Sequence, residues 1–437
     1  MTRFLVATMP IPGHIAPFAP VVRALIARGH QVAWYGSRFH QDKIEATGAT
    51  FYPIQNALDF GDSDYNKHFP ERTRYSGLKQ VVFDFKHLFV GSAEGQVKDL
   101  RHVISDFKAE VLLSDPAVVA GLVLGNEGFP HAMLDISVLS FESKDLAAFG
   151  LGLLPDSSFF GRIRNKITYW MVDHVVFREV NQAYRNIAQK NGWQYAPFRP
   201  TPSRYLTLQP TTPEFEYPVS DLPDTVHFIG PLLPDRPRAF TPPIWWNEVV
   251  NKTRPVVLVT QGTIATHADE LIQPTLEGLA SEDVLVIATT GGPSLSFPVP
   301  QNARVEAFVP FTELMPHVDV FVTNGGYGGI TIALANGVPV VSAGTTEDKM
   351  EVSNRVQFSG VGLNLKTNRP RPEQVRQAIQ QVLQGSYGQQ AKKIQKAFAA
   401  TRSAETAVEL LEELARTGKP VLNSRAAGTL SRKTAIQ

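Results

Sequence analysis

The chain has 437 residues, a length typical of two or three domains rather than one compact core. Its 42 Lys and Arg residues balance 41 Asp and Glu residues, which argues against nucleic acid or a strongly anionic membrane as the main partner. The lack of cysteine excludes disulfides, thiolate metal sites and a cysteine nucleophile. No apolar run is long enough to span a membrane or to act as a signal sequence, so we expect a cytoplasmic protein.

The chain opens with a strand–loop–helix–strand pattern. Residues 4–9 predict a buried strand, residues 18–26 place apolar side chains on one helical face, and residues 31–35 predict a second strand. This order predicts an α/β fold with a doubly wound parallel sheet and right-handed crossovers. His14 follows the first strand, at the sheet edge where ligands bind in such folds.

Further strands are expected at residues 110–114 and 130–138. Asp115 follows the earlier of these strands, on the same edge as His14, and it could also cap the next helix. Residues 139–193 predict mostly helix, with many aromatic side chains. Most of those side chains would be core, and some could line an apolar pocket.

A proline-rich stretch divides the chain into two halves of similar layout. We expect a first domain at residues 1–215, a linker at 216–245, a second domain at 246–422 and a mobile tail at 423–437. The second domain would hold strands at residues 256–259, 284–288, 304–308 and 319–322. Helices at 372–383 and 404–416 would close it.

A glycine-rich turn follows the strand at residues 319–322. It reads Asn324, Gly325, Gly326, Tyr327, Gly328 and Gly329, and a short helix at 330–336 comes next. Glycines let backbone N–H groups approach a ligand closely, and a helix N-terminus favours negative charge. The turn therefore predicts an anion site, and a glycine-rich turn that holds nothing is the alternative.

Several short motifs together resemble the GT-B, family 1 glycosyltransferases, which transfer sugars to small lipophilic molecules. PGHIAP at residues 12–17 is similar to the family's GHxxP loop, and Ser114-Asp115 follows a strand as it does there. In the second half the resemblance rests on VTQGT at 259–263, FVP at 308–310, VTNGG at 322–326, GVP at 337–339 and EDK at 347–349. It covers nearly the full length and implies two Rossmann-like doubly wound domains that face a cleft.

The resemblance also implies roles for particular residues. His14 would take the proton of the acceptor hydroxyl, and Asp115 would orient and compensate the imidazolium. The residues implied in donor binding are Thr263, Phe308, Val309, Asn324, Gly325, Gly326, Tyr327, Gly328, Gly329, Asp348 and Lys349. A packed or capping histidine is the alternative for His14, and a surface charge pair is the alternative for Asp348 and Lys349.

The reaction implied is an inverting, metal-independent transfer from a nucleotide sugar, with no further cofactor. UDP-glucose is the donor we favour. Asp62-Ser63-Asp64 has the DxD spacing of a metal-dependent class of sugar transferases, but it lies in a polar stretch that favours a solvated turn. We therefore predict no metal site.

Three features depart from the family pattern, and the last of them involves two positions. Asn324 stands where the family has a histidine, Ile332 stands where a glutamate grips the ribose, and Phe308 replaces a tryptophan base platform, with Phe311 in place of the glutamine that follows. Ile332 cannot bind a ribose hydroxyl, so a dTDP-sugar such as dTDP-rhamnose stays open as the donor.

For the acceptor, we name Phe60, Phe83, Phe141 and Phe149 as candidate contacts. They suggest a small apolar hydroxylated molecule such as a flavonoid or another phenol, bound by a monomer or weak dimer. The alternatives are a GT-B-like nucleotide-sugar epimerase and a non-catalytic sugar-nucleotide binding protein. A Rossmann oxidoreductase is disfavoured because no G-x-G-x-x-G follows the first strand.

Overall fold

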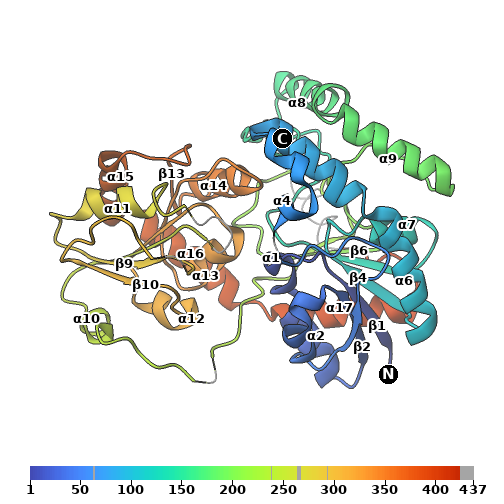
Figure 1. Ribbon diagram of the computed structural model, residues 1–437, viewed down its shortest axis with the longest axis horizontal. Helices are drawn as coiled ribbons and strands as arrows, with labels where there is room; N and C mark the ends of the chain where they lie inside the picture. Colours follow the sequence, from blue (N-terminus) through green and yellow to red (C-terminus); the bar gives the residue numbers. More distant parts are fainter. Residues whose placement is uncertain (63, 238, 263–266, 293, 424–437) are drawn as a thin grey trace, which may run out of the picture.

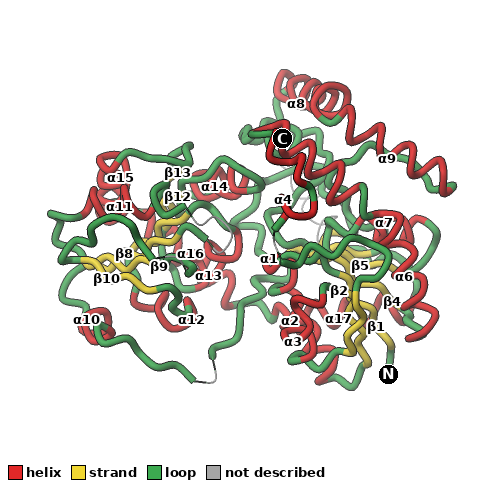
Figure 2. The backbone as a smooth tube through the Cα atoms, viewed as in Figure 1, coloured by secondary structure: helices red, strands yellow, loops and turns green. Residues whose placement is uncertain are grey.

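The computed structural model of the chain describes residues 1–62, 64–237, 239–262, 267–292 and 294–423. These residues form two α/β bodies side by side, each with a central sheet between helices (Figure 1). In Figure 2 the strands run through the middle of each body and the helices lie outside them. The predicted fold class is confirmed.

The sheet of the first body is parallel throughout, in the order β3-β2-β1-β4-β5-β6-β7. Its strands are β1 (Arg3–Ala7), β2 (Gln31–Gly36), β3 (Thr50–Pro53), β4 (Val111–Ser114), β5 (His131–Leu134), β6 (Leu206–Gln209) and β7 (Val226–Phe228). The last two come from the proline-rich stretch, so part of the expected linker extends this sheet.

The sheet of the second body is also parallel, in the order β10-β9-β8-β11-β12-β13. Its strands are β8 (Val256–Thr260), β9 (Leu285–Thr289), β10 (Ala303–Glu306), β11 (Val320–Thr323), β12 (Val340–Ser342) and β13 (Gly362–Asn364). The sequence pattern missed β13, which is short and carries a glycine and an asparagine.

Helices of the first body are α1 (Pro12–Ile15), α2 (Phe18–Ala27), α3 (Gln41–Glu45), α4 (Tyr65–His68), α5 (Gly77–Asp84), α6 (Ala93–Phe107), α7 (Val119–Asn126), α8 (Phe159–Met171) and α9 (Arg178–Asn191). Those that follow are α10 (Trp246–Asn251), α11 (Ile272–Leu279), α12 (Phe311–Leu314), α13 (Tyr327–Ala335), α14 (Lys349–Phe358), α15 (Pro372–Gln384), α16 (Tyr387–Ala399) and α17 (Ser403–Thr417). Short 3₁₀ turns lie at Arg38–His40, Pro70–Arg74 and Met315–His317, and π-helical turns lie at Phe85–Val90 and Val172–Val176.

Alternation along the strands builds a core on each face of each sheet. In β1, Phe4 and Val6 belong to the core on one face, whereas Leu5 belongs to the core on the other. In β8, Val256 and Val257 divide in the same way between two further cores. Burial of both faces explains why these strands are apolar without interruption.

The last helix returns to the first body. We expected residues 404–416 to close the second domain, but Val408, Leu411 and Leu414 of α17 pack in one core with Phe4 and Phe18. Figure 1 shows α17, in red, beside the blue α2 and β1. Arg28 and His30 also pair with Glu412 across this contact. A local helical pattern shows which face is apolar but not which sheet that face meets.

The region expected to be helical at 139–193 differs in two ways. Residues 139–158 form an irregular connection, and helix begins only at Phe159. Phe159, Phe160 and Trp170 are exposed rather than part of the core. Among the described residues, no helix combines the length and the apolar character needed to cross a bilayer.

Candidate active site

Each sheet reverses its strand order at one point, and the residues of interest follow the strands on either side of it. In the first sheet the reversal lies between β1 and β4, which lead to His14 and Asp115. In the second it lies between β8 and β11, which lead to Gln261 and Asn324. Crevices at such reversal points are where parallel α/β sheets bind ligands.

His14 and Asp115 lie together at the first reversal point. The Nδ1 atom of His14 is 3.3 Å from Oδ2 of Asp115. Nδ1 is buried and its alignment with the carboxylate is not that of a hydrogen bond. The exposed part of the imidazole therefore lies on the other side of the ring, and a small rotation would align Nδ1 with the carboxylate. Catalytic hydrogen bonds are often loose before substrate binds.

Asp115 is held rigidly by the backbone around it. Its carboxylate is fully buried and accepts hydrogen bonds from the N–H of Met9, at 2.6 Å, and from the N–H of Ala117, at 2.7 Å. The bond to Met9 ties Asp115 to the loop that carries His14. The alternative interpretation of Asp115 as a helix cap is wrong, because α7 begins only at Val119 and Val118 is its N-cap. It stabilises the turn between β4 and α7 instead.

A further carboxyl group, that of Asp135, follows β5 beside the same edge. Burial, with Glu216 and Asp115 nearby, raises the pKa of Asp135 to about 8. The sequence interpretation missed this residue because it placed Asp135 inside a strand ending at residue 138. The strand ends at Leu134, so Asp135 and Ser137 lie on the ligand edge of the sheet.

Asn324 spans the reversal point of the second sheet. Its side chain is buried, and Nδ2 donates a hydrogen bond to the carbonyl of Gln261, which follows β8. Gly325 then has a φ of +93°, a backbone conformation that favours glycine. These contacts fix the turn before α13. An amide has two N–H groups, so Asn324 keeps one donor for a ligand.

The first turn of α13 presents free backbone donors. The N–H groups of Tyr327, Gly328 and Gly329 have no hydrogen-bond partner among the described residues, as expected at a helix start. An added Cβ at Gly328 would meet nothing within 4 Å, so this surface is open. The side chain of Tyr327 is buried and its hydroxyl donates to the carbonyl of Pro210. Only its backbone can therefore face a ligand.

The other donor candidates differ in accessibility. The ring of Phe308 is 75% exposed and free to stack on a base, whereas Val309 is buried in the core and offers only backbone. Lys349 forms an ion pair with Glu347, whose φ of +55° marks a strained turn. Thr263 lies outside the described residues.

Asp348 connects the two bodies. Its carboxylate accepts a hydrogen bond from the hydroxyl of Ser137, on the ligand edge of the first sheet. Burial raises the pKa of Asp348, and the bond from Ser137 opposes that rise. The segment expected to contact the sugar therefore lies directly against the first body, where the predicted base is located.

The next turns of α14 hold the loop that follows β5. Arg355 is buried and binds Glu216 at 2.6 Å and Glu351 at 3.5 Å. Glu351 in turn accepts hydrogen bonds at 3.0 Å from the N–H groups of Gly150 and Gly152. We call these three charged residues the α14 cluster. The sequence interpretation missed it, because a buried arginine has no pattern of its own within a helix.

The candidate acceptor residues are all enclosed. Phe60 is fully buried and packs edge-on against Tyr65. Phe83 stacks on His87, Phe141 is buried in a small core, and Phe149 packs against the core of the second body. In this conformation they serve as packing residues, and their contact with an acceptor stays a prediction.

Asp62 and Asp64 are occupied by their own loop. Asp62 pairs with Lys67 and His68. These hydrogen bonds lower the pKa of Asp62, and the bond from His68 has the largest effect. Asp64 accepts from the N–H of Lys67 at the start of α4. Ser63 lies outside the described residues. This arrangement is that of a capped surface turn.

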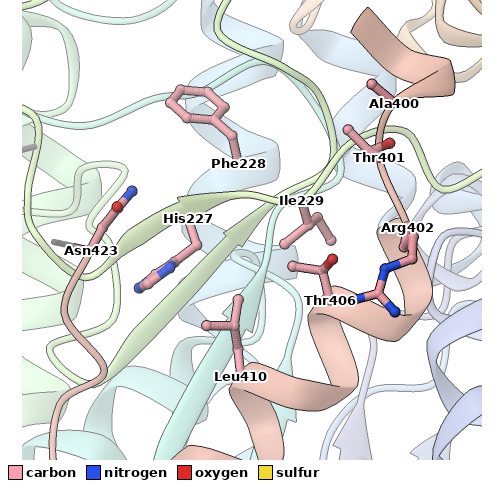
Figure 3. Close-up of a pocket in the computed structure, with 9 residues that line it drawn as sticks. All are labelled: His227, Phe228, Ile229, Ala400, Thr401, Arg402, Thr406, Leu410 and Asn423. Atoms are coloured by element: carbon pink, nitrogen blue, oxygen red, sulfur yellow. The ribbon is translucent and has the colours of Figure 1, made fainter. Parts of the chain in front are cut away.

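A cavity of about 390 Å³ lies elsewhere. Figure 3 shows its walls, which come from β7, from the connection between α16 and α17, and from Asn423. None of the candidate site residues lines it, so it is separate from the site at the two reversal points.

The chain is similar to known glycosyltransferases along most of its length. The 4'-demethylrebeccamycin synthase of Lentzea aerocolonigenes is 41% identical over 420 residues, covering 94% of this chain and 99% of the relative. UDP-glycosyltransferase 2 of Phaeomoniella chlamydospora is 32% identical over 437 residues, covering 94% and 95%. Residues 273–414 match the family model of the erythromycin biosynthesis protein CIII-like C-terminal domain.

Solved structures share the fold. The glycotransferase of kitacinnamycin superposes with a TM-score of 0.73 at 20% identity, covering 94% of this chain and 98% of the other. The glycosyltransferase VinC, solved in complex with dTDP, superposes with a TM-score of 0.67 at 21% identity, covering 95% and 100%. The identity to these relatives, together with the two parallel sheets and the order of the motifs, shows that the chain belongs to the family 1 glycosyltransferases of GT-B fold.

Proposed function

We propose that the protein transfers a sugar from a nucleotide sugar, UDP-glucose first, to a hydroxyl of a small apolar natural product such as a flavonoid or another phenol, with inversion. The observation that carries this proposal is the His14–Asp115 pair at the reversal point of the first sheet, the sheet edge from which Ser137 binds Asp348 of the second body. The name of the rebeccamycin relative supports a natural-product acceptor, and the name of the Phaeomoniella relative supports a UDP donor.

The reaction follows from these residues. The acceptor hydroxyl gives its proton to the imidazole of His14, and its oxygen forms a bond to the anomeric carbon as the bond to the diphosphate breaks. Asp115 stabilises the imidazolium, since its carboxylate is buried beside Nδ1. The diphosphate leaves toward the N–H groups of Tyr327, Gly328 and Gly329, which stabilise its growing charge without reorganising.

In this proposal the domain at 1–215 binds the acceptor and the domain at 246–422 binds the donor, except that α17 packs on the first body. Phe308 would carry the base, and Asn324, Thr263 and the glycine turn would bind the diphosphate. Asp348 and Lys349 would contact the sugar. We propose no metal and no further cofactor, and we propose the cytoplasm as the compartment.

The test compares His14→Ala with the unchanged protein. General base catalysis contributes about 10²–10⁴-fold, so we expect turnover to fall by that factor while nucleotide-sugar affinity, measured by calorimetry, stays within about twofold. The control is His174→Ala, because His174 is exposed and lies in the π-helical turn between α8 and α9. Turnover that is equal in His14→Ala and in the unchanged protein would refute the base. Activity that is lost in a chelator and restored by Mn²⁺ or Mg²⁺ would refute the metal-independent route.

A dTDP-sugar donor is the second candidate, carried by Ile332. This side chain packs against the core of the second body and has no group to bind a ribose hydroxyl. UDP-glucose, UDP-galactose, UDP-GlcNAc and dTDP-rhamnose should be compared with one phenolic acceptor by mass spectrometry. Faster transfer from dTDP-rhamnose than from UDP-glucose would select this candidate. Conversion of the nucleotide sugar without any acceptor would instead indicate the epimerase alternative.

A further inference from the structure

Helix α8 turns its polar side chains toward the protein and its apolar side chains toward solvent, the reverse of an ordinary surface helix. Its small and polar side chains face the protein: Asn165 donates to the carbonyl of Lys144, and Thr168 accepts from the N–H of Ala148. Gly161 lies so close to Asp156 that an added Cβ would clash with it. These contacts fix the rotation of the helix about its axis, and they leave its apolar face turned outward.

That outward face is large. The exposed fraction is 74% for Phe159, 80% for Phe160, 58% for Ile167 and 59% for Trp170. Ile163 and Met171 lie on the same side, and Val175 continues the stripe through the following π-helical turn. Their spacing of three and four residues places them on one face, which we call the α8 face. In Figure 1 α8 lies at the upper rim of the molecule, away from the second sheet.

The charges beside this face are basic. Arg162 and Lys166 lie on one flank of the apolar stripe and Arg164 lies on the other, by their positions along the helix. Between Phe159 and Met171 the sequence contains no acidic residue. Arg162 pairs with the buried carboxylate of Asp145 at 2.9 Å, whereas Arg164 and Lys166 form no ion pair with any residue that the structure describes. The nearest acid along the chain, Asp173, is buried and bound to Arg199.

We propose that the α8 face lies on an anionic lipid bilayer as a peripheral contact. A helix parallel to a membrane places aromatic and aliphatic side chains at the acyl boundary and basic side chains among the headgroups, which is the arrangement found here. The net charge of +1 for the whole chain does not oppose this, because the attraction depends on charge near the surface. The contact is independent of the transfer reaction proposed above.

A second copy of the chain is a less suitable occupant. A two-fold interface sets the same patch against itself, so Arg162, Arg164 and Lys166 of one copy would lie near those of the other. Like charges at close range oppose such a contact, whereas anionic headgroups neutralise Arg164 and Lys166, which have no acidic partner among the described residues.

The experiment uses the full-length chain and sedimented vesicles of phosphatidylcholine, alone or with a quarter of phosphatidylglycerol. We expect binding to the mixed vesicles, weakened by salt, with little binding to phosphatidylcholine alone. Tryptophan emission should shift to the blue on binding, and Trp170→Phe should remove that shift. Failure of the unchanged protein to bind the mixed vesicles overturns the proposal.

Three variants locate the contact. Ile167→Ser and Lys166→Glu should each weaken the vesicle partition on the order of tenfold. Ile244→Ser, at an exposed isoleucine far from α8, should leave it unchanged. All three positions are exposed, so circular dichroism and melting temperature should match those of the unchanged protein. Vesicle binding that is equal in all variants overturns the proposal. The proposal is also overturned if the protein binds no vesicles but forms a dimer, measured by light scattering, that Ile167→Ser abolishes.

Discussion

Replacement of Arg355 by leucine should destabilise the protein strongly. Arg355 and Glu216 are each about 2% exposed, and their charged atoms lie 2.6 Å apart. The guanidinium also donates to the carbonyl of Leu139 and lies over the ring of Tyr217, 4.1 Å from its centre. Arg355→Leu leaves the carboxylate of Glu216 buried without a cation. Removal of one partner of a buried pair costs about 3–5 kcal/mol of the free energy of unfolding.

The cost should depend on pH in a defined direction. Burial raises the pKa of Glu216 above the ordinary value of a glutamate, and Arg355 opposes that rise. Without Arg355 the pKa of Glu216 rises further in the folded state. A carboxyl group whose folded pKa is raised gives stability that is complete below the unfolded pKa and is lost as the pH rises through the folded pKa. The penalty of Arg355→Leu should therefore grow by up to about 1.4 kcal/mol per pH unit once the pH exceeds the folded pKa that Glu216 has beside Arg355, and it should level off above the folded pKa that Glu216 has without Arg355.

The assay is urea unfolding followed by circular dichroism at several pH values. Arg369→Leu is the matched control, because Arg369 pairs with Asp269 and Glu270 at the surface and its removal should cost at most about 1 kcal/mol. Glu216→Gln combined with Arg355→Leu should recover part of the loss, since the carboxylate of Glu216 is removed while that of Glu351 stays buried without Arg355. A loss below about 1 kcal/mol in Arg355→Leu, or a loss that does not change with pH, would show that this reasoning is wrong.

Asp135→Asn should remove a pH dependence of the unchanged protein. The pKa of Asp135 is raised from 3.8 to about 8, so its contribution to stability declines as the pH rises through that window. A plot of the free energy of unfolding against pH should therefore be flatter there for Asp135→Asn. An equal slope in both proteins would contradict this assignment. Gly325→Ala should lower the free energy of unfolding by about 1–3 kcal/mol and weaken nucleotide binding, because its φ is +93° and a Cβ would lie 2.7 Å from Oγ of Ser353. Gly388→Ala, in α16 and outside the candidate site, is its control: a Cβ there meets nothing within 4 Å, so stability and nucleotide affinity should both stay nearly unchanged, and an equal loss in the two variants would contradict this reasoning.

Much of the fold could be predicted because its signals are local. The apolar runs of β1, β8 and β11 each depend on a few neighbouring residues, and the structure confirms them. The sheet edges followed from strand order, so His14 and Asp115 were expected to lie together, as they do.

The remainder depends on contacts between distant parts of the chain. Nothing local distinguishes a helix that covers the second sheet from one that returns to the first, as α17 does. Arg355 within α14 resembles a surface arginine until Glu216, far away in the sequence, is brought beside it. The end of β5 was placed too late because residues 136 and 138 are apolar, and this hid Asp135.

The return of α17 also has a consequence for synthesis. The first body begins at the start of the chain, yet one face of its sheet is completed only by side chains near residue 410. The ribosome must therefore release the chain beyond Leu414 before Phe4 and Phe18 are fully covered, and until then the nascent chain exposes an apolar surface that chaperones recognise. A chain cut short before Ser403 would retain every candidate site residue and still lack a finished amino-terminal half.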